Sequence, residues 1–265
     1  MQKIINAHCH IYPAKIAARA VEGIKNFYQI DNMTLNGMTD DLIKEGSKIG
    51  CVHYLVHSVA TSPLQVRSIN SFLSEEVNSH PGIFTGFGTL HPDSETLEED
   101  LDHLISLGLK GVKLHPDFQG FELDKEKGYR IGKLIEERNL PTLIHCGDPR
   151  YNFSNPDQMK PFLEAHPDLT VIGAHMGGWS RFFEAAEKLS GIPNFYVDCS
   201  STFTYMSPED GESLIRSYGV DRVIWGTDYP MWEAETEIGY FNKISLTDEE
   251  RSMILYDNAA KLLNI

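Results

Sequence analysis

Two histidines separated by one residue, His8 and His10, end a short apolar run near the start of the sequence. Side chains alternate between the two faces of a β-strand, so a strand here would present both imidazoles on one face and Cys9 on the other. Two imidazoles on one face can bind the same metal ion. On its own, the pair would be explained at least as well as two polar residues at the end of a strand.

Three later apolar runs also end in a residue that can bind a metal or accept a proton. These residues are His145, His175 and Asp228. Neutral imidazole and carboxylate are ligands that suit zinc and its first-row neighbours, and a catalytic site keeps one position open for water. We therefore expect a divalent metal, zinc before manganese, that lowers the pKa of a bound water to about 7.

The elements that carry these residues follow a regular order, in which short β-rich runs alternate with amphipathic helical stretches. The first two strands are expected at the histidine pair and at 51–57. Six more are expected to begin at intervals of 25 to 31 residues, near Ile83, Lys110, Pro141, Leu169, Asn194 and Arg222. Eight such units predict an α/β fold, the (β/α)8 TIM barrel, and 265 residues are close to the ~250 of one barrel.

In this barrel the candidate residues would share one face, because each ends or follows its strand. Barrel enzymes place their chemistry at the carboxyl ends of the strands. We expect residues 1–265 to form one domain with a C-terminal helical tail, 247–265, that covers the outside of the barrel. Thr247, with Glu250 three residues later, is typical of the cap that begins such a helix.

The segment between the first two strands has two helical stretches, from Pro13 to about Phe27 and from Thr39 to near Gly50. Residues 29–38 between them lack clear periodicity. They are either a lid over the mouth of the barrel or an ordinary loop packed on its rim.

Composition excludes several classes of protein. The net charge of −15 and the absence of a Lys/Arg cluster argue against a nucleic-acid partner. Four widely spaced cysteines suggest neither a disulfide framework nor a structural zinc motif. No apolar run approaches the ~20 residues of a membrane span, and no signal-type segment precedes the first strand. We expect a soluble, cytoplasmic protein without a membrane partner.

The sequence around the candidate residues resembles a known family. Leu-Ile-His-Cys-Gly at 143–147, Gly-Ala-His-Met-Gly-Gly at 173–178 and Gly-Thr-Asp-Tyr-Pro at 226–230 look like the amidohydrolase superfamily. More narrowly, they resemble the branch that includes aminocarboxymuconate semialdehyde decarboxylase and its metal-dependent hydrolase relatives. The similarity covers nearly the whole chain.

The resemblance implies roles for the strand-end residues. His8, His10, His145 and Asp228 would bind one metal per chain. His175 would be the base that deprotonates a metal-bound water or orients the substrate, and Asp228 would be a second proton acceptor. The alternative for His175 is a structural role in a tight turn before Met176-Gly177-Gly178.

Lys113 and His115 end the fourth expected strand and leave three alternatives open. Some members of the superfamily carry a carbamylated lysine there, which bridges a second metal. Otherwise Lys113 stays an ammonium that holds a substrate carboxylate, or it is a structural lysine paired with Asp117 or Asp228.

Further candidates for substrate binding lie in loops after the fifth and sixth strands: Arg150, Trp179 and Arg181. Arginine binds carboxylates in bidentate fashion and aromatic walls suit a flat molecule, so the substrate is expected to be a small acid. For each residue, packing on a neighbour or a surface ion pair is at least as good an explanation. His57 and His91 are weaker candidates for the pocket wall.

These residues predict a metal-dependent hydrolase that acts on a small carboxylate-bearing molecule through a metal-activated water. The alternative is a metal-dependent non-oxidative decarboxylase of an unsaturated or aromatic acid, because the same ligands serve both reactions. The resemblance also implies a homodimer, in which a neighbouring chain contributes to the active site.

Overall fold

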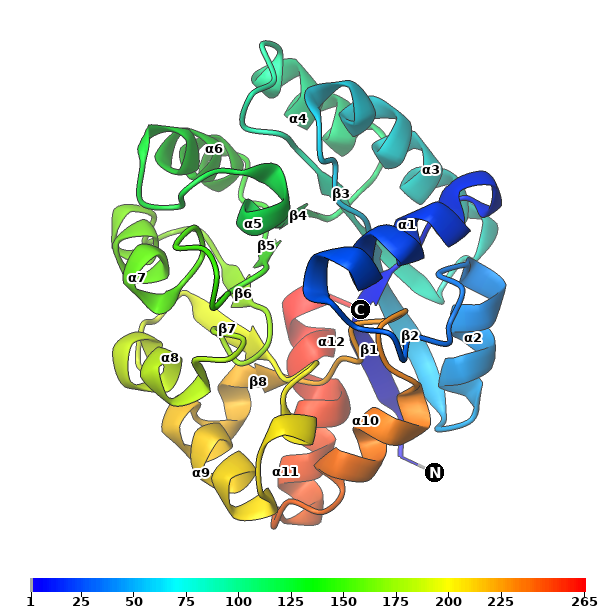
Figure 1. The fold of residues 1–265 in the computed structure, drawn as a ribbon, viewed down its shortest axis with the longest axis vertical. Coiled ribbons are helices and arrows are strands. Elements are labelled where there is room, and N and C mark those ends of the chain that lie inside the picture. The colour runs from blue at the N-terminus through cyan, green and yellow to red at the C-terminus, as the bar shows by residue number, and fades with distance from the viewer. Residues whose placement is uncertain (1) are drawn as a thin grey trace.

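Eight parallel strands form a nearly closed barrel in the computed structural model, which describes residues 2–265 (Figure 1). Their order in the sheet is their order in the chain. They are β1 (Ile4–His10), β2 (Cys51–His57), β3 (Phe84–Thr89), β4 (Gly111–Leu114), β5 (Thr142–Ile144), β6 (Val171–Gly173), β7 (Phe195–Asp198) and β8 (Val223–Ile224). The predicted TIM barrel is confirmed, and each later strand begins within two residues of its expected start.

The barrel closes between β1 and the residues that follow β8. Cys9 forms a parallel bridge with Tyr229, and the His10 N–H donates to the Tyr229 carbonyl at 2.7 Å. The side chains of Asn6 and Thr227 hydrogen-bond across the same seam at 2.9 Å. These contacts fix the end of β1, and so both of its histidines, against the loop that carries Asp228.

Helices surround the sheet (Figure 1). Those between successive strands each bury an apolar face; Ile131 and Ile135, for example, bury one side of α6. The α-helices are α1 (Ala14–Tyr28), α2 (Thr39–Ser47), α3 (Val66–Ser79), α4 (Leu97–Ser106), α5 (Pro116–Gln119), α6 (Glu126–Glu137), α7 (Pro156–Ala165), α8 (Phe182–Leu189), α9 (Pro208–Tyr218), α10 (Ala234–Phe241), α11 (Asp248–Ser252) and α12 (Asn258–Leu263). Short 3₁₀ turns are η1 (Pro63–Gln65), η2 (Phe203–Tyr205) and η3 (Val220–Arg222), and a π-helical turn, η4 (Met253–Asp257), joins α11 to α12. Among residues 2–265, no helix is both long and apolar enough to cross a membrane.

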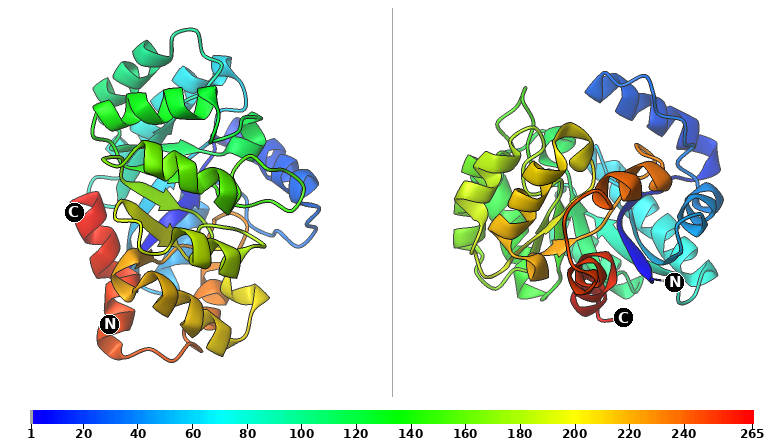
Figure 2. Two further views of the ribbon diagram at one scale, coloured as in Figure 1. Left: turned by 90° about the vertical axis from the view of Figure 1, so that its left-hand side faces the viewer. Right: turned by 90° about the horizontal axis from the view of Figure 1, so that it is seen from below.

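The C-terminal tail begins as predicted, with the reciprocal hydrogen bonds between Thr247 and Glu250. Its position differs in part from the prediction that it covers the barrel's outside. Ala259, Ala260 and Leu263 of α12 share one apolar cluster with side chains of several barrel strands, among them Ile5 and Leu143. The last helix therefore closes the lower end of the barrel's core, on the side of the barrel away from α1 (Figure 2).

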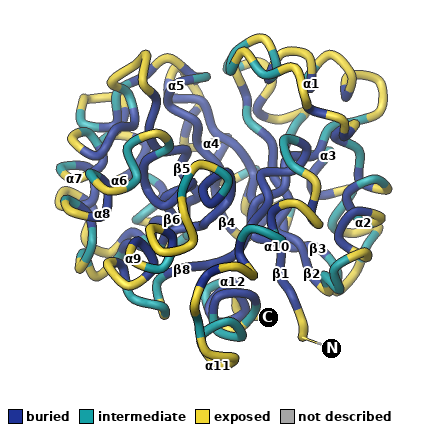
Figure 3. The backbone as a smooth tube through the Cα atoms, turned by 60° about the horizontal axis from the view of Figure 1, so that its bottom comes forward, coloured by how far each residue is buried: buried dark blue, intermediate teal, exposed yellow. Residues whose placement is uncertain are grey.

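Residues 29–38 are irregular and packed rather than free. Met33 and Leu35 are buried, and the Tyr12 N–H donates to the Gly37 carbonyl at 2.8 Å. This favours the rim loop over the lid. The cover over the mouth is instead α1, which is largely exposed on its outer side while the strands are buried (Figure 3). Ile24 and Tyr28 of this helix line the pocket below.

Candidate active site

A small pocket opens at the carboxyl ends of the strands, beneath the C-terminal half of α1. Its wall includes His10, Tyr28, His115, His145, His175 and Asp228. The histidines that end or follow β1, β2, β5 and β6 are all buried at this end of the barrel, as is Asp228 after β8. Because each predicted residue ends or follows its strand, the barrel brings these residues together at one end.

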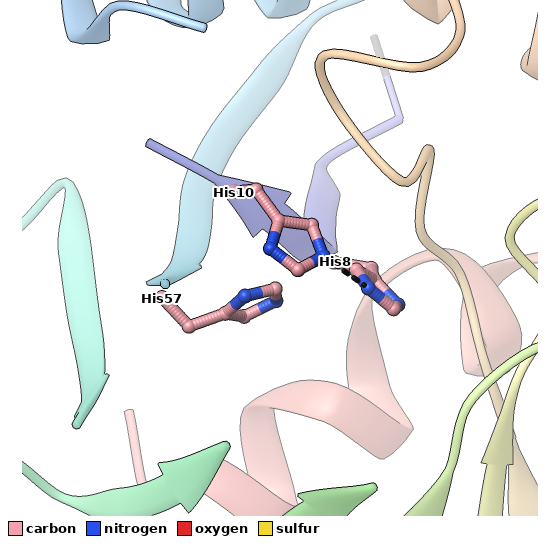
Figure 4. A group of neighbouring side chains, drawn as sticks. All are labelled: His8, His10 and His57. Carbon is pink, nitrogen blue, oxygen red and sulfur yellow. Dashed lines mark hydrogen bonds between the residues drawn. The ribbon is translucent and has the colours of Figure 1, made fainter. Parts of the chain in front are cut away.

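His8 lies at the centre of this group. Its Nδ1 contacts Asp198 Oδ2 at 2.9 Å, and since a carboxylate only accepts, Nδ1 carries the hydrogen and Nε2 presents a lone pair. That Nε2 lies 3.2 Å from Nε2 of His10 and 3.2 Å from Oδ1 of Asp228. Figure 4 shows His8 and His10 turned toward each other, with His57 beside them. Three of the four predicted ligands therefore converge.

His145, the fourth predicted ligand, reaches this group through His175. Nε2 of His145 donates to the Gly147 carbonyl at 3.1 Å, and Nδ1 of His175 donates to the Ser200 carbonyl at 3.1 Å. The remaining nitrogens, Nδ1 of His145 and Nε2 of His175, face each other at 3.1 Å as two lone pairs. A cation or proton beside them would remove this repulsion. The atoms of His8, His175 and Asp228 that could bind a metal ion lie within 4.8 Å of one another. His145 is not part of this group.

The backbone around the site adopts conformations that aim these side chains. His175, Ser201 and Asp228 have φ values of 57°, 52° and 59°, in the left-handed region that non-glycine residues seldom occupy. The Ser201 hydroxyl donates to Asp228 Oδ2 at 2.8 Å, which leaves Oδ1 directed at the histidines. At position 226 a Cβ would lie 2.8 Å from Cβ of His8, so glycine is required for β8 to approach β1.

Burial sets the charge of these groups. It lowers the pKa of His8 and His10 well below the usual range, so both imidazoles are neutral and keep a lone pair. Burial raises the pKa of Asp228 to about 7. A bound cation acts in the opposite direction and favours the carboxylate.

Lys113 is fully buried on β4, and its Nζ lies 3.3 Å from Nε2 of His8. Within the described residues it forms no ion pair with Asp117 or Asp228, so the structural pairing is not observed. Burial lowers its pKa to about 8, and the nearby carboxylates, Asp198 first, oppose that shift. The ammonium is thus a charge without a direct anionic partner, which suits an acidic substrate.

His115 does not fit the second-metal alternative. Its Nδ1 accepts from the Phe118 N–H at 3.2 Å, so the neutral ring carries its hydrogen on Nε2 and offers a metal no free lone pair. Its ring stacks on that of His145 with 3.8 Å between centroids. His115, Asp117 and His145 also lie close enough together to hold an ion, but in this structure Nδ1 of His115 accepts from the Phe118 N–H and Nε2 of His145 donates to the Gly147 carbonyl.

Arg150, which was predicted to bind substrate, makes its contacts in this structure with protein groups. Its Nε and Nη2 donate to the two oxygens of Asp148 at 3.0 and 2.7 Å. Its Nη1 donates to the Phe27 carbonyl in the last turn of α1, and the guanidinium lies 4.3 Å from the centre of the Phe27 ring. Arg150 therefore fastens the end of the helix that covers the pocket.

The other two loop candidates lie on the rim. Arg181 Nη1 donates to Glu184 at 3.2 Å, the ion pair that was the alternative explanation. The Trp179 ring packs edge-on against Tyr28, with 5.4 Å between centroids. Trp179 thus contacts the pocket wall, whereas Arg181 does not contact the metal-binding candidates.

Replacing Arg150 with alanine should loosen the end of α1. A hydrogen bond from a charged group contributes about 1.5–3 kcal/mol, so local opening of the helix should become about 10-fold or more frequent. Hydrogen exchange of the amides in α1 measures this, with Arg138→Ala, which removes a surface pair with Asp102, as the control. Unchanged protection of α1 would show that Arg150 does not fasten it.

Comparison with known proteins identifies the family. The family model described as Amidohydrolase matches residues 5–265, almost the whole chain. The chain belongs to the amidohydrolase family. The resemblance inferred from the sequence is therefore confirmed, and amidohydrolase-like enzymes use a divalent metal.

Individual relatives are distant in sequence, and the alignments cover about three quarters or more of the chain. The gamma-resorcylate decarboxylase of Polaromonas sp. (strain JS666 / ATCC BAA-500) is 21% identical, over 75% of this chain and 76% of the relative. An uncharacterized TIM-barrel protein from Bordetella bronchiseptica has a TM-score of 0.81 at 19% identity, covering 99% of this chain and 98% of its own. A dihydroxybenzoic acid decarboxylase from Polaromonas sp. JS666, with bound manganese and the inhibitor 2-nitroresorcinol, has a TM-score of 0.75 at 17% identity, covering 100% and 97%.

These relatives correct the predicted reaction. The sequence favoured a hydrolase, but the matching curated relatives and several solved structures are decarboxylases of aromatic acids. The hydrolase prediction is wrong on this finding, and the decarboxylase alternative is the better supported. The error arose because the ligand types are common to both reactions.

Sequence reasoning missed two residues of the candidate site, Asp198 and Tyr28, and ranked a third, His57, low. Asp198 ends β7 and orients His8, and the strand-end rule applied to every strand would have found it. His57 ends β2 and was only a weak candidate for the pocket wall. Tyr28 reaches the pocket from α1, and no pattern in the sequence places that helix over the mouth.

A buried carboxyl behind the site gives a prediction on stability. Glu237 on α10 is 4% exposed, and its Oε2 accepts the Ser201 N–H at 3.2 Å. Burial raises its pKa to about 8 from the ordinary 4.5. Between these two pKa values the folded state binds a proton that the unfolded state releases. The free energy of unfolding therefore falls as the pH rises through this range.

Glu237→Gln should remove this decline. Between pH 5 and 8 the variant should gain on the order of 3 kcal/mol in unfolding free energy relative to the parent. Urea unfolding of the metal-free protein at these two pH values measures the gain. Glu235→Gln, exposed on the same helix, is the control. A parent and variant with the same pH slope would contradict the prediction.

Proposed function

We propose that the protein catalyses the non-oxidative decarboxylation of a small aromatic acid, with one divalent metal ion per chain. One observation carries the proposal: donor atoms of His8, His175 and Asp228 converge within 4.8 Å beside the buried ammonium of Lys113. Such a site combines metal ligands, a group that moves a proton and a cation for a carboxylate. The decarboxylases among the relatives support the same reaction.

The donor set fits a divalent metal. We propose His8, His10, His145 and Asp228 as its ligands, with His145 contributing the lone pair of Nδ1. Both nitrogens of His57, a fully buried ring 4.4 Å from that of His10, lack a partner among the described residues. Buried polar atoms of this kind are seldom left unpaired, which supports a bound group between these rings. When bound, the metal would supply a Lewis acid for the oxygen atoms of the substrate.

The protein's own residues would divide the remaining work. Decarboxylation breaks the bond between the ring and its carboxylate, releases carbon dioxide and adds one proton to the ring carbon. We assign the substrate carboxylate to Lys113. Nε2 of His175, which carries no hydrogen while Nδ1 donates to the Ser200 carbonyl, would first take up a proton from water and then pass it to the ring carbon. Asp228, whose Oδ1 lies 3.2 Å from Nε2 of His8, is the second candidate for the proton.

The identity of the metal is a finer prediction. Imidazole and carboxylate ligands favour zinc on chemical grounds. The manganese bound to the Polaromonas decarboxylase makes manganese the second metal to test. Elemental analysis after growth with each metal, together with activity after reconstitution, distinguishes them.

Two further predictions concern the cell and the assembly. We propose a homodimer, to be tested by light scattering on the purified protein. We propose a cytoplasmic location on the strength of the free thiols of Cys9, Cys51, Cys146 and Cys199, which reducing compartments maintain. Fractionation of the source cells tests that location.

A panel of aromatic acids tests the reaction. The metal-loaded protein is incubated with hydroxybenzoates, including 2,6-dihydroxybenzoate, and with muconate-type acids, and both carbon dioxide and the ring product are quantified. We expect release of carbon dioxide in equal amount to a product without the carboxylate. Hydrolysis of lactones or amides by the same preparation, with no acid decarboxylated, would reject the proposal.

A further inference from the structure

The hydroxyl of Tyr28 lies over the pocket, near the end of the covering helix α1. Its Oη is 2.9 Å from Nε2 of His115 and 3.5 Å from Nε2 of His145. The ring is packed edge-on against Trp179 and is tilted against Phe118. Tyr28 is therefore held above the proposed metal ligands by contacts on several sides.

The hydrogen bond with His115 has a defined direction. Because Nδ1 of His115 accepts the Phe118 N–H, its Nε2 carries the hydrogen and donates it to Oη of Tyr28. The His115 ring is fixed between two parallel rings, Phe118 and His145, each with its centroid 3.8 Å away. His115 thus presents a rigid donor to the tyrosine oxygen.

This leaves the hydroxyl hydrogen of Tyr28 for another acceptor. The second nearby nitrogen, Nε2 of His145, already donates its hydrogen to the Gly147 carbonyl. Neither histidine therefore accepts from Tyr28, and within the described residues no other hydrogen bond of its hydroxyl occurs. The hydrogen is free to point into the pocket, toward the space between Tyr28 and the proposed metal ligands.

We propose that Tyr28 donates its hydroxyl hydrogen to an oxygen of the bound aromatic acid, and that His115 is the positioning residue that orients it. This inference rests on the proposed function. Tyr28 would hold the acid from the side of α1, while Lys113 holds it from the floor of the pocket.

The acid can enter beneath Tyr28 only when the end of α1 moves. In its present form the pocket holds little more than a water-sized molecule, so the end of α1 must shift to admit an aromatic ring. The buried apolar residues of α1 around the mouth form a small cluster, Val21 and Ile24 with Met33, separate from the main core. Opening must separate this small cluster and break the hydrogen bond from Arg150 to the Phe27 carbonyl.

Tyr28→Phe tests the inference, because it removes the hydroxyl and keeps the ring. Binding of 2,6-dihydroxybenzoate to the metal-loaded protein is measured by calorimetry, and carbon dioxide release is measured in parallel. We expect binding about 10- to 100-fold weaker, in line with loss of one hydrogen bond to a charged group. The metal content should be unchanged, and the melting temperature should fall by no more than the loss of the His115 hydrogen bond explains. Tyr151→Phe, on the exposed rim, should bind as the parent does.

His115→Phe tests the positioning role, since it keeps a stacked ring without the N–H. It should weaken binding less than Tyr28→Phe does, and the double variant should bind no more weakly than Tyr28→Phe alone, because both changes remove one interaction. Fully additive losses would show that His115 does not act through Tyr28.

The two readouts separate this inference from the proposed function. Parent-like binding and turnover by Tyr28→Phe, in a protein that does release carbon dioxide, overturns the inference and leaves the function. Weakened binding in a protein that decarboxylates no acid rejects the function and keeps Tyr28 as a residue that binds acids. A parent protein that binds no hydroxybenzoate overturns the inference.

Discussion

His8→Ala is expected to leave the purified protein with less than about a tenth of the parent's metal and to lower turnover by about 10³-fold or more. The histidine provides one of four proposed ligands, and a metal that acts as a Lewis acid contributes several kcal/mol to the reaction. Elemental analysis and single-substrate kinetics measure the two effects. His103→Ala, on α4 and away from the site, should retain both.

Asp198→Asn should affect the same metal site less strongly than His8→Ala does. The carboxylate holds His8 through Nδ1 at 2.9 Å, and loss of such a partner weakens metal binding by about 10- to 100-fold. Competition with a chelator measures the affinity.

Full metal content and full activity in His8→Ala would place the metal, or the chemistry, elsewhere in the molecule.

Lys113→Met is expected to lower kcat/KM for an aromatic acid by about 10²- to 10³-fold while the metal content stays the same. A charge-assisted hydrogen bond to the substrate carboxylate is lost, and nothing in the fold replaces that ammonium. The folded protein should be as stable as the parent or more so, because replacing a buried charge with an apolar side chain often stabilises a protein.

The outcome also decides between the alternatives for Lys113. Kinetics, elemental analysis and thermal unfolding are measured on the same preparation, with Lys133→Met on the exposed face of α6 as the control. Loss of metal with activity would favour the carbamylated lysine. Loss of stability alone would favour a structural lysine and contradict its role in binding the acid.

The fold and the strand-end residues were predictable from the sequence because both follow from local rules. Parallel strands in a barrel bring their carboxyl ends to one face, so His8, His10, His175 and Asp228 had to meet once the strands were placed. Errors at strand starts of one or two residues did not matter, since each residue was identified as the end of its own apolar run.

The parts that sequence could not provide depend on distances between elements. Arg150 was expected to bind substrate, yet it is held by Asp148 and by the last turn of α1. Tyr28 reaches the pocket only because α1 lies across the mouth. The choice between hydrolysis and decarboxylation was beyond any spacing argument, because the same ligands support both.

The most direct test of the proposed decarboxylation follows the carboxyl carbon itself. A hydroxybenzoate labelled with carbon-13 in its carboxyl group is incubated with the metal-loaded protein, with the metal-free protein and with the reconstituted protein, and both products are analysed by mass spectrometry. We predict labelled carbon dioxide and an unlabelled ring product from the first and third samples only. Retention of the label in every ring product, across the panel of acids, or its equal release without metal would contradict the assignment of the site as a metal-dependent decarboxylase.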